Sequence, residues 1–174
     1  MVGEKRMNMI QREYHLRFHT PAFLGNAEQS GQWRTPPFKA QLRQWWRVAY
    51  AASKGFQLTV AQMREEEGKL FGHAWLEDNC SKSRVRIRLL HWNTGGLEKN
   101  RWLSLDRVTH PEAPGAAADL YLGYGPVEPP RGEKTSTLKA KAAIQADEKN
   151  TFSIAYPVEY TPLIEQALAL MSQF

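Results

Sequence analysis

Two stretches of the chain alternate between apolar and polar side chains, which is the pattern of a β-strand with one buried face. In residues 11–20 the apolar positions are Tyr14, Leu16 and Phe18. Residues 83–92 alternate three apolar side chains with three arginines, namely Val85, Ile87 and Leu89 against Arg84, Arg86 and Arg88. The second strand is therefore expected to place three cations on one sheet face, about 7 Å apart.

Three further stretches have the spacing of amphipathic helices. The first covers residues 38–53, after two prolines that the first turn of a helix tolerates, and it ends at Lys54-Gly55. Its apolar stripe is Phe38, Leu42, Trp45 and Ala49. This spacing predicts that Trp45 lies in the core.

The other two helices are shorter. Thr59 can cap a helix that runs to about Leu70, and Val60, Met63 and Leu70 are expected to face inward. Residues 161–174 form the last one, with Pro162 in its first turn. Its apolar positions are Leu163, Ile164, Ala167, Leu168 and Met171.

The remaining strands are expected in the second half of the chain. Residues 120–124 are predicted as a short strand, and residues 138–145 alternate and are predicted to pair with residues 151–156 across a turn. The resulting β-α-β-β-α order predicts an α+β fold of the ferredoxin-like (RRM-like) kind. No stretch of the sequence corresponds to the closing strand of that fold. One sheet edge is therefore expected to be covered by a partner or by another segment.

Charge and tryptophan are unevenly distributed along the 174 residues. Residues 1–110 hold 18 basic and 10 acidic side chains, a net of +8, whereas residues 111–174 have a net of −3. All six tryptophans lie between Trp33 and Trp102. We expect one domain over residues 1–174, with a basic, Trp-rich body (11–125), a loop or hinge (126–136) and a strand pair plus helix (137–174). The basic body favours a polyanionic partner.

Several functional classes are not supported by the sequence. A single cysteine, Cys80, permits neither an internal disulfide nor a multi-cysteine zinc site. The sequence shows no phosphate-cradling loop motif, no nucleophile-elbow motif and no metal-ligand cluster, so no metal or cofactor is expected. It also shows no long apolar run and no signal-peptide pattern, which predicts a cytoplasmic protein without a membrane partner.

The first helix carries a basic stripe that is a candidate phosphate site. Lys39, Arg43 and Arg47 lie at i, i+4 and i+8, with Arg34 just upstream. Arginine can bind phosphate in a bidentate manner, although such a stripe is also typical of a solvated helix face. Trp46 lies between the basic and apolar stripes, where it can either stack on a base or cover the edge of the core.

The strand arginines and two histidines are the other candidates. Arg84, Arg86 and Arg88 would repel one another unless they meet a polyanion, acidic partner residues or solvent. An exposed sheet of this topology is a common platform for single-stranded RNA. His15 and His19 are weak candidates for a general base, since they share a face about 13 Å apart on a strand. Histidines in this pattern are more typical of the surface of a half-exposed strand.

Three motifs in residues 14–72 resemble one known family. Residues 20–27 read TPAFLGNA, residues 34–39 read RTPPFK and residues 42–47 read LRQWWR. Together they are similar to the start of the RAMP superfamily, in particular the first subunit of Cmr-type (type III-B) CRISPR effector complexes. The sequences LFG at 70–72 and LGYG at 122–125 also resemble family motifs. Asn26 and Ala40 depart from the pattern, because the family has glycine at both positions.

The resemblance implies an RNA-binding, non-catalytic subunit of a type III CRISPR ribonucleoprotein that acts in antiviral defence. Its expected partners are CRISPR guide RNA, target RNA and other effector subunits. The family's basic motif matches Arg34, Lys39, Arg43 and Arg47, whereas the strand arginines follow from the pattern alone. Two alternatives stay open: a metal-independent endoribonuclease that processes CRISPR precursor RNA with His15 or His19 as base, and a structural assembly subunit that binds acidic partners.

Overall fold

The computed structural model describes residues 8–74, 80–103, 107–108, 116–123, 125–129, 136–139 and 141–173. The chain divides into two compact units, each built from segments that are distant in sequence. The first holds the described parts of Met1–Tyr14, Thr35–Leu90 and Thr151–Phe174; the second holds those of His15–Arg34 and His91–Asn150. The predicted hinge at 126–136 falls inside the second unit, and residues 130–135 lie outside the described residues.

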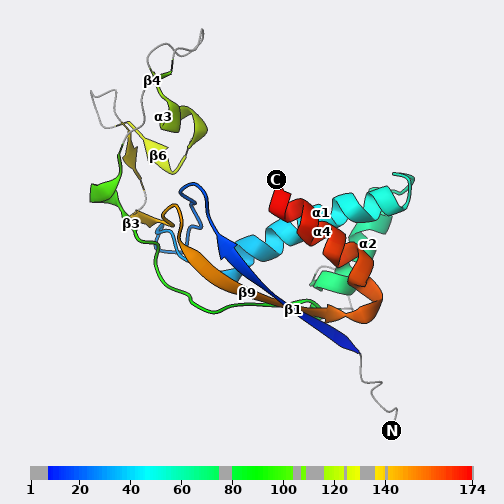
Figure 1. Ribbon diagram of the computed structural model, residues 1–174. Coiled ribbons are helices and arrows are strands. Elements are labelled where there is room, and N and C mark those ends of the chain that lie inside the picture. Colours follow the sequence, from blue (N-terminus) through cyan, green and yellow to red (C-terminus); the bar gives the residue numbers. More distant parts are fainter. Residues whose placement is uncertain are drawn as a thin grey trace. The chain divides into compact units, whose positions relative to one another are not determined.

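A three-stranded sheet of order β1-β9-β2 forms the base of the first unit (Figure 1). Its strands are β1 (Met9–Arg17), β2 (Arg86–Leu89) and β9 (Lys149–Pro157). β2 is antiparallel to β9, with Arg88 opposite Ser153. β1 also runs antiparallel to β9, because the Val158 amide donates to the Asn8 carbonyl and the Phe18 amide donates to the Glu148 carbonyl.

Helix α1 (Thr35–Ser53) covers the apolar face of this sheet. It begins three residues earlier than predicted, so that the two prolines lie in its first turn, where a missing amide hydrogen costs little. Its buried residues are Phe38, Leu42, Trp46 and Ala49. The Phe38 ring lies 5.8 Å from the ring of Phe152 on β9. The contact fixes which sheet face is inside.

Two further helices complete the first unit. Helix α4 (Thr161–Gln173) follows the short helix η2 (Val158–Tyr160), packs beside α1 and buries Ile164 and Ala167 (Figure 1). Helix α2 (Val60–Phe71) begins at the predicted cap, where Thr59 and Gln62 form a capping box, and ends at Gly72. The expected extents of α2 and α4 are thus confirmed within a residue or two.

The described part of the second unit contains short two-stranded pairs and two short helices. Its strands pair as β3 (Leu97–Glu98) with β8 (Ala142–Ala143), β4 (Arg107–Val108) with β5 (Ala116–Ala117), and β6 (Val127–Glu128) with β7 (Thr137–Leu138). The helices are η1 (Lys99–Arg101) and α3 (Ala118–Leu122). The backbone at Gly31 approaches that of Ala143 so closely that a Cβ would lie 2.7 Å from its Cα.

Polar contacts of Glu148 link segments of this unit, which has a small core of Val127, Leu138 and Ala143. The Glu148 carboxylate accepts hydrogen bonds from the amides of Gly96 (2.6 Å) and Gln145 (2.5 Å) and from Trp33 Nε1 (3.0 Å). A single carboxylate thereby joins three separate segments of the second unit.

Two predicted strand features are wrong. Residues 120–124 do not form a strand, since Ala118–Leu122 is helix α3, with Asp119 in its first turn and Gly123 at its end. Residues 151–156 pair with β1 and β2 and not with residues 138–145, which instead pair with β6 and β3. Alternation indicates which face of a strand is buried but does not identify its neighbour.

Candidate nucleic-acid interface

Arg86 and Arg88 lie on the solvent face of the sheet, as predicted, whereas Arg84 precedes β2, which is shorter than the predicted strand. Val85 and Leu89 are buried, whereas Arg84, Arg86 and Arg88 are exposed. Opposite Arg86 and Arg88 on β9 stand Ala155 and Ser153, whose side chains are small. We call these five residues the arginine face: Arg84, Arg86, Arg88, Ser153 and Ala155. Its small side chains leave the guanidinium groups uncovered.

The ion pairing of these arginines is weak. Arg84 lies 3.9 Å from Glu159, and both side chains are about half exposed. Among the residues that the structure describes, no carboxylate lies within 4.0 Å of Arg86 or Arg88. Ser153 Oγ donates to Glu13 on β1 at 3.4 Å, which places one carboxylate at the far side of the face. Two adjacent cations are thus available to an external anion.

The basic stripe of α1 faces α2 instead. Arg43 Nε donates to Glu67 Oε1 at 2.6 Å, and Arg47 donates twice to the same carboxylate at 2.9 Å. Glu67 is only 3% exposed, so its charge requires these partners. Lys39 Nζ donates to the Phe71 carbonyl at 3.3 Å, and burial, followed by the Arg43 charge, lowers the pKa of Lys39. These three cations join α1 to α2.

Arg34 lies in the second unit, where its Nη1 donates to the Gly25 carbonyl at 2.6 Å. This bond fastens the loop whose sequence resembles the RAMP motif. The Asn26 side chain accepts the Ser30 amide and donates to Gln32, so the residue that departs from the family pattern stabilises the same loop. Arg34 therefore acts within the second unit as a loop anchor.

Trp46 belongs to the core, and the prediction for its neighbour is wrong. The Trp46 side chain is 1% exposed, stacks on Tyr50 with ring centroids 4.9 Å apart and meets the edge of Phe71. Trp45, predicted to be in the core, is only partly buried. Positions 45 and 46 both satisfy helical spacing from Leu42, and the neighbouring Tyr50 and Phe71 select position 46. A buried indole offers no platform to a base.

The two histidines are exposed on and beside β1. His15 lies on the strand, and His19 lies in the following bend with its Nδ1 3.4 Å from Arg17 Nη2. In the described part of the chain, no group of three His, Cys, Asp or Glu side chains has the geometry of a metal site. None of the described helices combines the length and apolarity needed to cross a membrane.

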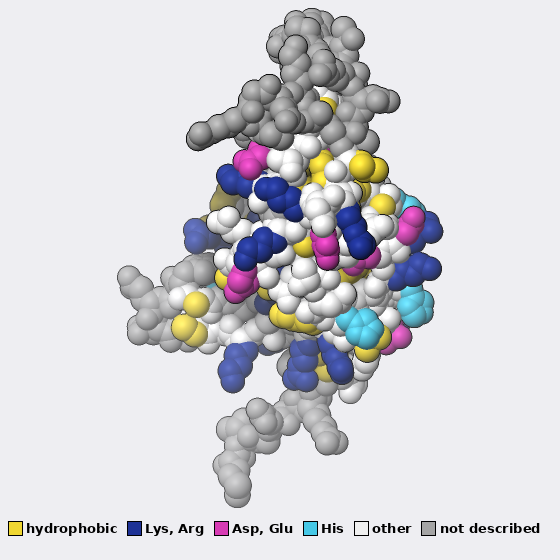
Figure 2. All heavy atoms as spheres, turned by 90° about the vertical axis from the view of Figure 1, so that its left-hand side faces the viewer, with side chains coloured by type: hydrophobic (Ala, Val, Ile, Leu, Met, Phe, Trp, Pro, Cys, Tyr) yellow, Lys and Arg dark blue, Asp and Glu magenta, His cyan; other side chains and the backbone are white. Residues whose placement is uncertain are grey.

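Figure 2 shows how charge is distributed over one face of the molecule. Lys and Arg side chains occur there in several groups, with Asp and Glu side chains between them. Surface charge on this view therefore does not single out one polyanion site. The arginine face is distinguished by its local geometry, with two neighbouring cations beside small residues.

Glu67 is the important residue that charge patterning missed. It ends a run of three glutamates, which is typical of a solvated helix face. Its position in the sequence could nevertheless have indicated that it is buried. Met63, Glu67 and Leu70 lie at i, i+4 and i+7, on the inward side of the helix. A carboxylate on that side predicts a cationic partner on the neighbouring helix.

Comparison with known proteins identifies no relative: no protein-family model matches the chain, and no curated protein matches it. The similarity to RAMP proteins therefore rests on the motifs between residues 14 and 72. Of these motifs, the helix sequence LRQWWR supplies the Glu67 partners and the buried Trp46. Leu42 and Trp46 of this motif are buried in the first unit.

Proposed function

We propose that this chain binds RNA through its phosphate backbone, using the arginine face, as a non-catalytic subunit of a type III CRISPR effector. The observation that carries the RNA-binding proposal is the pair Arg86 and Arg88, exposed side by side without a described ion-pair partner. Arginine donates to phosphate in a bidentate geometry. Two such groups about 7 Å apart match successive phosphates of an extended strand.

The arrangement of the first unit supports a ferredoxin-like assignment. Its elements follow in the order β1, α1, α2, β2, β9, α4, and the sheet places the third strand, β9, between the other two. With one additional helix, this order is similar to the β-α-β-β-α part of that fold. Most residues of the second unit lie in the sequence between β2 and β9.

The arginine face favours phosphate contacts over base contacts. RRM-like sheets that read bases present aromatic side chains on the open face. Here the aromatic residues of β9, Phe152 and Tyr156, are buried, and Ser153 and Ala155 occupy the open side. Binding is therefore expected to be largely independent of sequence. Sequence choice would come from base pairing between guide and target, as in other RNA-guided systems.

The test compares two double variants that each change the charge by four units. Arg86→Glu/Arg88→Glu alters the arginine face, and Lys54→Glu/Arg64→Glu alters exposed cations of the helices. With a labelled single-stranded RNA, the first pair is expected to raise Kd about tenfold or more, and the second less than threefold. Circular dichroism spectra check that both variants fold. An equal rise in Kd for both double variants would mean that only the net charge matters. That result would overturn the assignment of RNA binding to the arginine face.

A further inference from the structure

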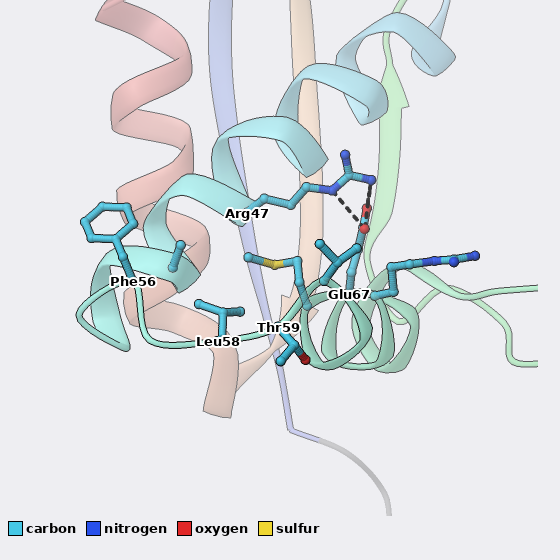
Figure 3. Close-up of a pocket in the computed structure, with 9 residues that line it drawn as sticks. Arg47, Phe56, Leu58, Thr59 and Glu67 are labelled. Carbon is cyan, nitrogen blue, oxygen red and sulfur yellow. Dashed lines mark hydrogen bonds and ion pairs between the residues drawn. The ribbon is translucent and has the colours of Figure 1, made fainter.

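An apolar groove lies on the helical side of the first unit, between the end of α1, the following loop and the start of α2. Its volume is about 500 Å³. Figure 3 shows Phe56 at one end and the Arg47–Glu67 pair at the other, with Leu58 and Thr59 between them. Ala51, Val60 and Met63 add apolar surface to the walls. The groove is distinct from the arginine face and does not depend on the RNA proposal.

The walls of the groove are fixed in the free chain. Helix α1 ends in a Schellman turn, in which the Phe56 amide donates to Ala51 (2.8 Å) and the Gly55 amide donates to Ala52 (3.0 Å). The capping box at Thr59 fixes the start of α2, and the ion pairs of Glu67 hold the two helices together. A preformed groove saves a partner the entropy of ordering these segments.

Two large apolar side chains are exposed at this groove. Phe56 is 69% exposed and Val60 is 77% exposed, although Val60 was predicted to face inward. That prediction is wrong because Val60 is the first residue of α2, where the chain has just turned away from the core. Clustered apolar exposure of this kind is typical of a binding surface.

Phe56 also has a strained backbone. Its φ of +59° lies in the left-handed region, which a bulky side chain adopts only at an energetic cost. Gly55, with a φ of +58°, already supplies the residue that a Schellman turn needs. The turn itself does not require an aromatic side chain at position 56. Such strain at an exposed position points to a function for the side chain.

The charge of the polar end indicates what the groove would bind. Two arginines, Arg43 and Arg47, share the single carboxylate of Glu67, and Arg47 and Glu67 line this end of the groove. These three side chains together carry an excess positive charge beside an apolar wall. We propose that the groove binds a helical segment of a partner protein that presents leucine-like side chains together with carboxylates. The apolar side chains would pack on Phe56 and Val60, and the carboxylates would face the arginines.

Two labelled synthetic peptides test this proposal by fluorescence anisotropy. Both are amphipathic helices with three leucines on one face; one has glutamates at the flanking positions and the other has lysines. The wild-type chain is expected to bind the glutamate peptide at least about tenfold more tightly. Phe56→Gly is expected to weaken that binding about tenfold. Its melting temperature should be no lower than wild type, because glycine adopts a φ of +59° without strain.

Val158→Ser is the matched control, because Val158 is 47% exposed in the same unit but does not line the groove. It should leave the affinity for the glutamate peptide unchanged. Equal affinity for both peptides, no binding of either, or unchanged binding by Phe56→Gly would overturn the proposal. A loss of folding in Phe56→Gly would also contradict it, since Phe56 would then have a structural role.

Discussion

Glu67 is a single buried carboxylate that gives the neighbouring cations Arg43 and Arg47 a structural role. Arg43 and Arg47 keep 39% and 42% of their side chains exposed while their donors converge on Glu67. The arginines therefore stay partly hydrated, and most of the desolvation cost arises from burial of the carboxylate. Substituting Arg43 would disturb this contact, and substituting Lys39 would remove the bond to the Phe71 carbonyl, besides changing any contact with RNA. The α1 stripe is for that reason a poor place to test RNA binding.

The Glu67→Gln variant is expected to lower the free energy of unfolding by about 1–3 kcal/mol. Its amide cannot compensate two arginine charges, although their exposure limits the loss. Urea unfolding with an unchanged m-value would measure the difference. The neighbouring Glu66→Gln removes a more exposed contact with Lys69 and should cost about 0.5 kcal/mol or less. Equal losses in the two variants would show that Glu67 has no special role.

At the scale of elements, β9 is the central strand and carries the most buried ionisable group of the first unit's sheet. Tyr156 is fully buried, and its hydroxyl donates to Glu165 Oε1 of α4 at 3.3 Å. Burial, and next the Glu165 charge, raise the pKa of Tyr156 to about 12. The folded chain thus holds the phenolic proton more tightly than the unfolded chain, whose tyrosines titrate near 10.

This shift predicts an alkaline loss of stability. The contribution of Tyr156 is fully present below pH 10 and is lost as the pH rises from about 10 to about 12. Tyr156→Phe lacks the titrating group, so its unfolding free energy should fall less steeply over this range. Urea unfolding at a series of pH values compares the two slopes. Parallel curves for wild type and variant would contradict the assignment.

Helices were predictable from local signals, whereas strand pairing was not. Paired prolines, the Thr59 cap and the glycine after Lys54 mark α1 and α2 in a few residues each. By contrast, β9 pairs with strands more than 60 and more than 130 residues away in sequence, and no local pattern encodes that choice. The same limit applies to the site. Arginine exposure on β2 followed from alternation, but the Glu67 contact depended on how α2 packs.

At the scale of the whole molecule, the tryptophan-rich composition has mainly a structural explanation. Trp33 donates to Glu148, Trp46 packs on Tyr50 and Phe71, and Trp102 donates to Ser136 at 2.9 Å. Trp92, at 54% exposure, differs from these three. Aromatic content therefore adds little to the case for RNA binding. The case depends on the charge of one sheet face.

The first unit carries both proposed surfaces. It is assembled from three separate segments, so the arginine face forms only when β1, β2 and β9 come together. The arginine face lies on the open side of this sheet, and the apolar groove lies between α1 and α2. The two proposals therefore assign the RNA backbone and the partner protein to different surfaces of one unit. The RNA affinity of Phe56→Gly is expected to equal that of wild type.

The salt dependence of RNA affinity tests the central claim most directly. Each arginine that neutralises a phosphate releases counterions, so the slope of log Kd against log salt reports the number of such contacts. For Arg86→Glu/Arg88→Glu the slope should be smaller than that of wild type by about 2. The Lys54→Glu/Arg64→Glu control should retain the wild-type slope. An unchanged slope in Arg86→Glu/Arg88→Glu would contradict RNA binding at the arginine face.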